Sequence, residues 1–466
     1  MSVDFLRQLR DIVGTLHVLT ESPDTDAYTT DWRGRYRGIP LCVVKPANTA
    51  EVATVVSACA AAGIAMVPQG GNTGLCGGAT PIGGEVVINL TRLNRIRAID
   101  PANNTMIVDA GCTLAAVQAA AESADRLFPL SLAAEGTATI GGNLATNAGG
   151  VQVLRYGNTR ELCLGLEVVM PDGRVWDGLR SLRKNNTGYD MKHLFIGAEG
   201  TLGLITAAVL KLFPRPRQLV TAWVGVPSPA AAVAVLTRLR DKMGDRVTAF
   251  ELISHSSLEL VLRHIPACRA PLPTPSPWQI LIELSDTFDH TLPEAIEETF
   301  ADAISADEIS DAVIAHNEKQ ASALWALREN IPEAQKIEGH SIKHDISVPV
   351  SQLPAFIERA DQALQKSFPG LRIICFGHLG DGNLHYNQSK SAAQENAEFL
   401  EQTHAVNRIV HDIAHELGGS ISAEHGIGQL KREELPRYKS NTEISMMHSI
   451  KKSFDPLNLM NPGKVL

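Results

Sequence analysis

The sequence lacks several features that would assign it to common classes of protein. Its seven cysteines, at positions 42, 59, 76, 112, 163, 268 and 375, form no C-x-x-C pair, which argues against an iron–sulfur module or a redox dithiol. An odd number of scattered cysteines fits free thiols in a reducing cytosol, so we expect a cytoplasmic protein. No uninterrupted apolar run is long enough to cross a bilayer. The first residues carry an acid at Asp4 and show no basic-then-apolar signal pattern.

Positive charge is also scarce, and the net charge of −9 argues against a protein that binds nucleic acid or anionic membranes. A hydrophobic content of 44% with 20% charged residues is typical of a globular protein. At 466 residues the chain is too long for one ordinary domain, so two or three are expected. We find no internal repeat and no low-complexity segment.

The rigid segment Pro214-Arg-Pro216 interrupts the pattern of strands and helices and predicts a domain boundary. We expect a helical leader over residues 1–37, a first domain over 38–216, a second over 217–440 and a C-terminal segment over 441–466. Further strands are expected at 64–67, 86–90, 106–109, 166–170, 175–176 and 220–226, and helices at 114–124, 230–240, 294–306, 318–329 and 394–417.

Two local signals are more specific than periodicity. Asn48 and Glu51 form a plausible capping box before an alanine-rich segment that ends at Gly63, which predicts a helix from Asn48 to Gly63. Pro171-Asp-Gly-Arg174 separates two short apolar runs and predicts a hairpin turn.

Three glycine-rich segments lie in the first domain. Gly70-Gly71-Asn72-Thr73-Gly74 follows a strand, and glycines there let backbone N–H groups approach an anion such as a diphosphate. One short glycine cluster is a weak motif that a tight turn also explains. The further runs Glu135–Gly150 and Gly197–Ile205 favour one long ligand. No G-x-G-x-x-G is present, because position 72 is Asn, and no P-loop occurs, so neither of these nucleotide motifs applies.

The second domain contains a set of candidate metal ligands. His378 and His385 flank Gly380-Asp381-Gly382, and Glu424 and His425 follow further along the chain. The odd spacing of the two histidines would put them on opposite faces of a straight strand, but the glycine turn can bring both rings to one side. Two imidazoles and one carboxylate suit zinc or manganese and leave coordination positions open, as a catalytic metal requires. The alternative is that the histidines are hydrogen-bonded structural residues.

Four segments together resemble the FAD domain of the vanillyl-alcohol-oxidase-type flavoproteins: Pro68–Gly78, Gly136–Gly150, Leu182–Asp190 and Phe195–Gly203. The second half resembles the FAD-linked oxidase C-terminal domain, and within this group the chain is most similar to the D-2-hydroxyglutarate and D-lactate dehydrogenases. The resemblance covers nearly the whole chain from about residue 38. It implies an α+β fold with a two-part FAD-binding domain and an α+β substrate (cap) domain that has an antiparallel sheet. The C-terminal segment would return to the FAD domain.

By this resemblance the loop Gly70–Gly74 would hold the FAD pyrophosphate, and the loop Glu135–Gly150 would line the opposite side of the FAD site. The loop Gly197–Ile205 would lie near the adenine and ribose. Covalent members of the family use a histidine in or near the first loop. Asn72 and Thr73 stand there in this chain, so we expect non-covalent FAD. The implied FAD-binding residues are Pro68, Gly70, Gly71, Asn72, Thr73, Gly74, Gly136, Thr137, Gly142, Asn143, Gly149, Glu199, Gly200, Ile205 and Asn461. For Asn461, a loop that merely ends a helix is an alternative.

The resemblance also assigns roles in the second domain. His378, His385 and Glu424 would bind a divalent metal, zinc or manganese. Asn387 matches a substrate or metal contact, and Arg328 and Lys343 match residues that bind the substrate carboxylate, although each could be an ordinary surface charge. His425 would touch the substrate and act as the general base, because a neutral imidazole has a pKa suited to accepting a hydroxyl proton.

One position departs from the family pattern. Hydroxyglutarate-type enzymes usually have a threonine four residues after the arginine that corresponds to Arg328. Here the residue is Pro332, which has no hydroxyl and no N–H. The length of the substrate therefore stays open. His344, beside Lys343, could support the site or be a plain strand residue, and we favour the latter.

The sequence thus predicts an FAD- and metal-dependent dehydrogenase that oxidises a D-2-hydroxy acid, such as D-2-hydroxyglutarate or D-lactate, to the 2-oxo acid. With no iron–sulfur cysteines, the flavin would pass its electrons to an external carrier, an electron-transfer flavoprotein or a quinone pathway. A homodimer is possible. The alternatives are a flavoenzyme of the same fold that acts on glycolate or an aryl alcohol, a flavin-free metallohydrolase, and a non-catalytic metal-binding protein.

Overall fold

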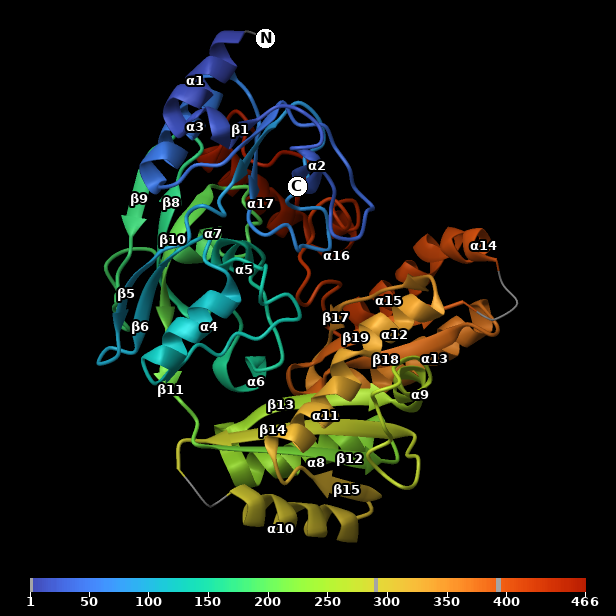
Figure 1. Ribbon diagram of the computed structural model, residues 1–466. Helices are drawn as coiled ribbons and strands as arrows, with labels where there is room; N and C mark the ends of the chain where they lie inside the picture. Colours follow the sequence, from blue (N-terminus) through green and yellow to red (C-terminus); the bar gives the residue numbers. More distant parts are fainter. Residues whose placement is uncertain (1–2, 289–291, 391–394) are drawn as a thin grey trace. The chain divides into compact units, whose positions relative to one another are not determined.

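The computed structural model describes residues 3–288, 292–390 and 395–466, so the expected helix start at Gln394 lies outside the described residues. The chain forms two compact units (Figure 1). The first comprises residues 1–150, 157–215 and 424–466, and the second comprises residues 151–156 and 216–423. The sequence placed the return to the first domain after residue 440, whereas the structure assigns the chain to the first unit from Glu424 onward.

The first unit contains two larger sheets. Three parallel strands, β2 (Cys42–Val44), β4 (Val86–Asn89) and β3 (Met66–Gln69), form one sheet with the antiparallel edge strand β1 (Val18–Leu19). The other sheet is antiparallel in the order β5-β6-β10-β8-β9, with bounds Ile96–Asp100, Thr105–Asp109, Leu204–Lys211, Cys163–Val169 and Val175–Gly178. The hairpin β8–β9 confirms the predicted turn, in which Met170 N–H donates to Arg174 O at 2.8 Å.

Helix α3 (Thr49–Ala62) connects β2 to β3, as parallel strands require. Asn48 caps it by accepting a 2.9 Å bond from Glu51 N–H, and Gly63 ends it in the left-handed conformation at φ 65°. The helix is as predicted, but the capping box is incomplete because the Glu51 carboxylate accepts from Ala47 N–H and not from Asn48 N–H. Helix α4 (Leu114–Ser123) matches the second expected helix.

The expected helical leader is only partly helical. Helix α1 (Val3–Val13) is followed by β1, which pairs with β2, and by the short helix α2 (Asp26–Thr29). The leader also contacts the first glycine loop, since Asn72 Nδ2 donates to Thr30 O at 2.9 Å. These contacts make the leader an integral part of the first unit.

The second unit is built on an eight-stranded antiparallel sheet, which confirms the expected α+β cap domain. Its strands are β12 (Gln218–Val226), β13 (Val247–Ser254), β14 (Trp278–Asp286), β15 (Asp311–Ile314), β16 (Ser341–Ile342), β17 (Ile346–Ser347), β18 (Arg372–His378) and β19 (Asn383–Ser389). Helices lie against this sheet (Figure 1), and their buried apolar side chains form two clusters with those of the strands. One cluster includes α8 (Pro229–Met243), α10 (Leu292–Ser305), α13 (Leu353–Ser367), α14 (Asn396–Glu401) and α15 (Thr403–Glu416). The other includes α9 (His255–His264), α11 (Glu318–Glu329) and α12 (Ile331–Glu338).

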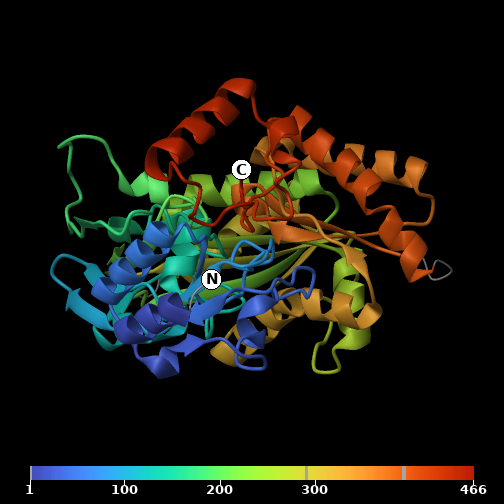
Figure 2. The ribbon, with the colours of Figure 1, turned by 90° about the horizontal axis from the view of Figure 1, so that it is seen from above.

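The loop 179–190, which joins β9 to α7 (Lys192–Phe195), is largely exposed and projects from the first unit (green, left in Figure 2). All seven cysteines are buried, and none of them is in a disulfide bond in the part of the chain that the structure describes. Within the described residues no helix combines the length and the apolar character needed to span a bilayer.

Candidate active site

The first unit contains a pocket where the three glycine-rich loops meet. The predicted FAD residues that line it are Pro68, Gly70, Gly71, Asn72, Thr73, Gly74, Gly142, Asn143, Glu199, Gly200 and Ile205, and His425 also lines it. Gly71 is required by close packing, since a Cβ there would lie 1.9 Å from the carbonyl oxygen of Thr137. The first two loops therefore touch through their backbones.

Four predicted FAD residues do not line this pocket: Gly136, Thr137, Gly149 and Asn461. Thr137 supports the first loop from behind, through the contact just described. The Asn461 amide donates to Gly78 O at 3.0 Å and to Glu199 O at 2.8 Å, so it holds two segments of the pocket wall from outside.

Sequence reasoning missed several lining residues that are small or apolar: Leu75, Cys76, Ala79, Leu90, Ala110, Gly141, Ala145, Phe195, Gly203 and Leu204. Such residues are equally common in protein cores, so no sequence signal distinguishes residues that line the pocket from residues of the hydrophobic core. The polar residues Gln69, Thr139 and Thr146 were also missed.

The pocket's polar groups fit a large polar cofactor. Thr139 Oγ1 and Asn143 Nδ2 are buried, line the pocket and have no hydrogen-bond partner within the described part of the chain. Buried polar atoms are normally paired, so these two point to a ligand that supplies partners. Glu199 is the acid that lines the pocket; its side chain is half-buried, and desolvation raises its pKa. Its carboxylate accepts from Ile427 N–H at 2.7 Å and Gly428 N–H at 2.8 Å, which fixes the returning chain in the first unit.

In the second unit, the glycine turn brings two histidines together. Strand β18 ends at His378, a short 3-10 turn (Leu379–Asp381) follows, and Gly382 at φ 89° leads into β19, on which His385 lies. The two rings lie 5.8 Å apart between centroids and meet edge to face. Because the left-handed backbone at Gly382 lets the chain reverse, the two histidines lie on neighbouring antiparallel strands. Their odd spacing therefore does not keep the two rings apart, as expected from the sequence.

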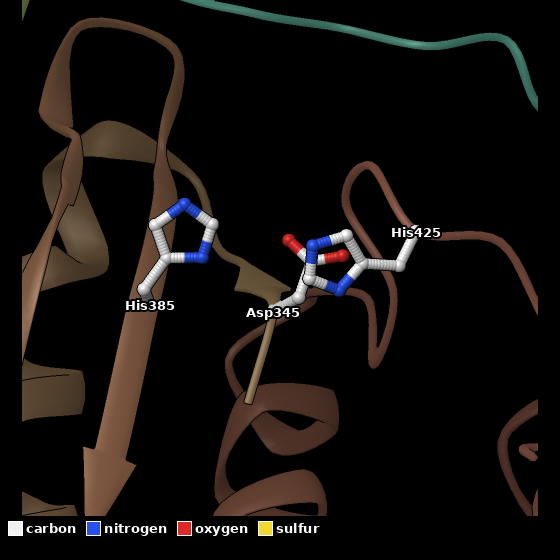
Figure 3. A group of neighbouring side chains, drawn as sticks. All are labelled: Asp345, His385 and His425. Atoms are coloured by element: carbon white, nitrogen blue, oxygen red, sulfur yellow. The ribbon is translucent and has the colours of Figure 1, made fainter. Parts of the chain in front are cut away.

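Glu424 and His425 follow directly on Ala423, whose N–H donates to Asp345 O at 3.1 Å. The possible ligand atoms of His378, His385 and Glu424 lie within 4.8 Å of one another. Those of Asp345, His385 and His425 form a second such group (Figure 3). Asp345 was missed, because no motif distinguishes it from an ordinary strand-end acid. One carboxylate and two imidazoles in either group suit zinc or manganese.

Glu251 on β13 is an acid that no sequence motif singled out. It is fully buried, and its carboxylate accepts from His378 Nδ1 at 2.5 Å and from Arg328 Nε at 2.7 Å. Burial alone would raise its pKa, but His378 and then Arg328 lower it to about 2. Because Nδ1 of His378 points to Glu251, Nε2 is the nitrogen that could bind a metal. The Arg328 guanidinium also stacks over the Phe376 ring at 4.7 Å.

The remaining predicted residues occupy different surroundings. Lys343 is half-buried between β16 and β17. The Asn387 side chain is engaged with the protein, accepting from His344 N–H at 3.1 Å and donating to Gln335 at 2.8 Å. His344 is buried with Nδ1 2.9 Å from Tyr386 O. Pro332 lies exposed in the first turn of α12.

A two-sheet flavin-type unit with a glycine-lined pocket, together with an α+β cap domain in the same chain, defines a flavoprotein of the vanillyl-alcohol-oxidase type. Comparison with known proteins is consistent with this class. Residues 40–178 match the FAD binding domain family, and residues 215–465 match the FAD linked oxidases, C-terminal domain. The chain belongs to the FAD-linked oxidase family, and it is an FAD-dependent oxidoreductase.

Similar proteins include D-2-hydroxyglutarate dehydrogenase of Xanthomonas citri pv. viticola, 38% identical over 98% of this chain and 96% of that protein. The mitochondrial D-2-hydroxyglutarate dehydrogenase of Arabidopsis thaliana is 36% identical over 98% of this chain and 80% of that protein. Among solved structures, p-cresol methylhydroxylase with substrate bound has a TM-score of 0.78 at 18% identity, covering 99% of this chain and 96% of that one. An alkyldihydroxyacetonephosphate synthase has a TM-score of 0.75 at 20% identity, covering 99% and 86%. The likeness to these two structures shows the shared fold.

Proposed function

We propose that this protein oxidises D-2-hydroxyglutarate, or a closely related D-2-hydroxy acid, to the 2-oxo acid with FAD as the electron acceptor. The names of its relatives support this substrate. The observation that carries the proposal is Glu251, which holds a candidate metal ligand, His378, and a cation suited to a carboxylate, Arg328, side by side. A 2-hydroxy acid has a hydroxyl group that can bind a metal held by His378 and a carboxylate that can bind Arg328.

The residues divide the chemistry as follows. His378, His385 and Glu424 would hold a divalent metal, zinc or manganese, whose charge lowers the pKa of a bound hydroxyl. Arg328 and Lys343 would fix a substrate carboxylate, and the planar guanidinium suits two parallel hydrogen bonds. His425 would accept the hydroxyl proton, since a neutral imidazole can do so near pH 7.

FAD would occupy the glycine-lined pocket and supply the redox chemistry. Thr139 and Asn143 would provide hydrogen bonds to it, and the loop containing Gly70 and Gly71 would approach its phosphates. Asn72 stands where covalent relatives have a histidine, and its side chain is bound to Thr30 O, which supports non-covalent binding. The electrons would leave through an external carrier, an electron-transfer flavoprotein or a quinone pathway.

A panel of hydroxy acids with an artificial electron acceptor tests the proposal. We expect D-2-hydroxyglutarate or another D-2-hydroxy acid to give the highest kcat/KM, with the L-enantiomers inactive. Preferred oxidation of glycolate or an aryl alcohol would overturn the substrate assignment. A colourless purified protein without flavin absorbance would instead favour a metallohydrolase.

The metal is tested separately. Dialysis against a strong chelator should abolish turnover while the flavin absorbance persists, and zinc or manganese should restore turnover. A metal-free protein with full activity would contradict the metal assignment and leave the flavin chemistry intact.

A further inference from the structure

Glu251 lies in the sheet of the second unit, between the side chains of His378 and Arg328. It lies on β13 directly opposite His378 of β18 in the register of the two strands. Helix α11 brings Arg328 to the same carboxylate. Each carboxylate oxygen accepts from a different partner, Oε1 from His378 Nδ1 at 2.5 Å and Oε2 from Arg328 Nε at 2.7 Å. One fully buried acid therefore joins two predicted site residues that are far apart in sequence.

The two bonds have different consequences. A histidine that donates its Nδ1 proton to a carboxylate has its tautomer and ring orientation fixed, with the Nε2 lone pair left for a metal. For Arg328, the bond to Glu251 uses Nε, which carries one of the five N–H donors of the guanidinium, and the other four are on the two terminal nitrogens. Phe376 holds the guanidinium plane by stacking at 4.7 Å, and the same ring lies 5.0 Å from that of His385.

We propose that Glu251 is a positioning residue that orients the metal ligand His378 and the carboxylate-binding Arg328 together. This inference rests on the proposed function, because it assumes that a metal and a hydroxy acid bind there. It predicts that one substitution at Glu251 weakens both metal binding and substrate binding.

Glu251→Gln is the informative substitution. A glutamine amide has one acceptor oxygen, so it can serve only one of the two donors and turns an N–H group toward the other. We expect the affinity of the apo-protein for zinc, measured by competition with a chromophoric chelator, to fall roughly 10- to 100-fold. We also expect KM for the hydroxy acid to rise, while the flavin absorbance stays at the wild-type level.

Glu283→Gln is the matched control. Glu283 is a second glutamate of this sheet, paired with Ala249 of β13, and burial raises its pKa. Its carboxylate accepts from Trp325 Nε1 at 3.0 Å and takes no part in the bonds to His378 or Arg328. We expect its zinc affinity to stay at the wild-type value.

The outcomes distinguish the positioning role of Glu251 from the proposed metal binding itself. A folded Glu251→Gln variant with wild-type zinc affinity and wild-type KM overturns the role of Glu251. If the wild-type protein itself binds no zinc or manganese, the metal part of the proposed function fails instead. Should Glu251→Gln fail to fold, Glu251→Asp keeps the charge on a shorter side chain. Reduced zinc affinity at an unchanged Tm in that variant supports the inference, and unchanged affinity overturns it.

Discussion

The side-chain amide of Asn461 donates a 2.8 Å hydrogen bond to the backbone carbonyl of Glu199, 262 residues earlier in the chain. The same amide donates to Gly78 O at 3.0 Å. One side chain thus ties the C-terminal tail to two segments that line the glycine-rich pocket. The residue is 1% exposed, so water cannot replace these bonds.

Asn461→Ala should weaken FAD binding, because the pocket wall would lose both bonds. At roughly 0.5–1.5 kcal/mol per bond, the loss corresponds to a roughly 5- to 150-fold higher Kd. Asn458→Ala is the control, since Asn458 is exposed and has nearly the same left-handed backbone, φ 52° against 46°. Release of FAD on dilution, followed by flavin fluorescence, measures the effect. An equal increase of the Kd for FAD in both variants would show that backbone strain, and not the loss of the two hydrogen bonds, causes the increase.

Gly71→Ala should destabilise the first unit, because the new Cβ would lie 1.9 Å from Thr137 O. No atom of the described residues lies within 4 Å of a Cβ built at Gly74, so Gly74→Ala should keep the wild-type Tm. Thermal unfolding of the two apo-proteins measures this difference. An unchanged Tm for Gly71→Ala would show that the two loops can separate without cost.

The features that the sequence predicted well are local. Helix α3 follows from its caps, Asn48 and Gly63, and the hairpin β8–β9 from its turn residues, because short-range hydrogen bonds decide both. The FAD-binding class was predicted from the resemblance of four segments, three of them glycine-rich, to a known family. The strand order of the second sheet, in which β10 lies between β6 and β8, could not be predicted from any one segment.

The features that the sequence missed depend on long-range pairing. Glu251 reads as a single acid in an apolar strand, and only the register of β13 with β18 places it opposite His378. The return to the first unit at Glu424 was predicted too late, because it depends on bonds from Ile427 and Gly428 to Glu199. None of these partners is close in sequence.

His425→Ala should lower kcat by roughly 10²- to 10⁴-fold, the usual contribution of a general base. The flavin absorbance should remain, since His425 is one residue of a long pocket wall. His448→Ala, on the exposed face of α17 (Asn441–Phe454), is the control. Steady-state assays with the best substrate of the panel measure both variants. Undiminished turnover in His425→Ala would assign the base to another residue.

Pro332→Thr should shift the preference toward the longer diacid, because the resemblance in sequence implies that a threonine at this position helps to hold the substrate. A hydrogen bond to a charged group contributes about 1.5–3 kcal/mol, so the kcat/KM ratio of D-2-hydroxyglutarate to D-lactate should rise roughly 10-fold or more. Pro354→Thr is the control, since Pro354 also lies in the first turn of a helix, α13. An unchanged ratio would show that other residues measure substrate length.

Lys464 makes the stability of the first unit depend on pH. Its side chain is 1% exposed, and its Nζ has no hydrogen-bond partner within the described residues. Burial lowers its pKa from 10.5 to about 8, although Glu85 opposes the shift. Between these values the unfolded chain holds a proton that the folded protein has lost, so this residue's contribution to stability rises with pH. Below about pH 8 both states are protonated, and the cost of burying the charge is present in full.

Lys464→Met should therefore raise Tm at pH 7, and its advantage over the wild type should shrink from pH 8 to 10.5. Subtracting the two Tm curves cancels groups that titrate equally in both proteins. Lys452→Met, on the exposed side of α17, controls for the change in net charge. The scans are run with FAD in equal excess, because a bound ligand adds to Tm. A Tm difference that stays constant across this range would contradict a buried, charged Lys464 as its source.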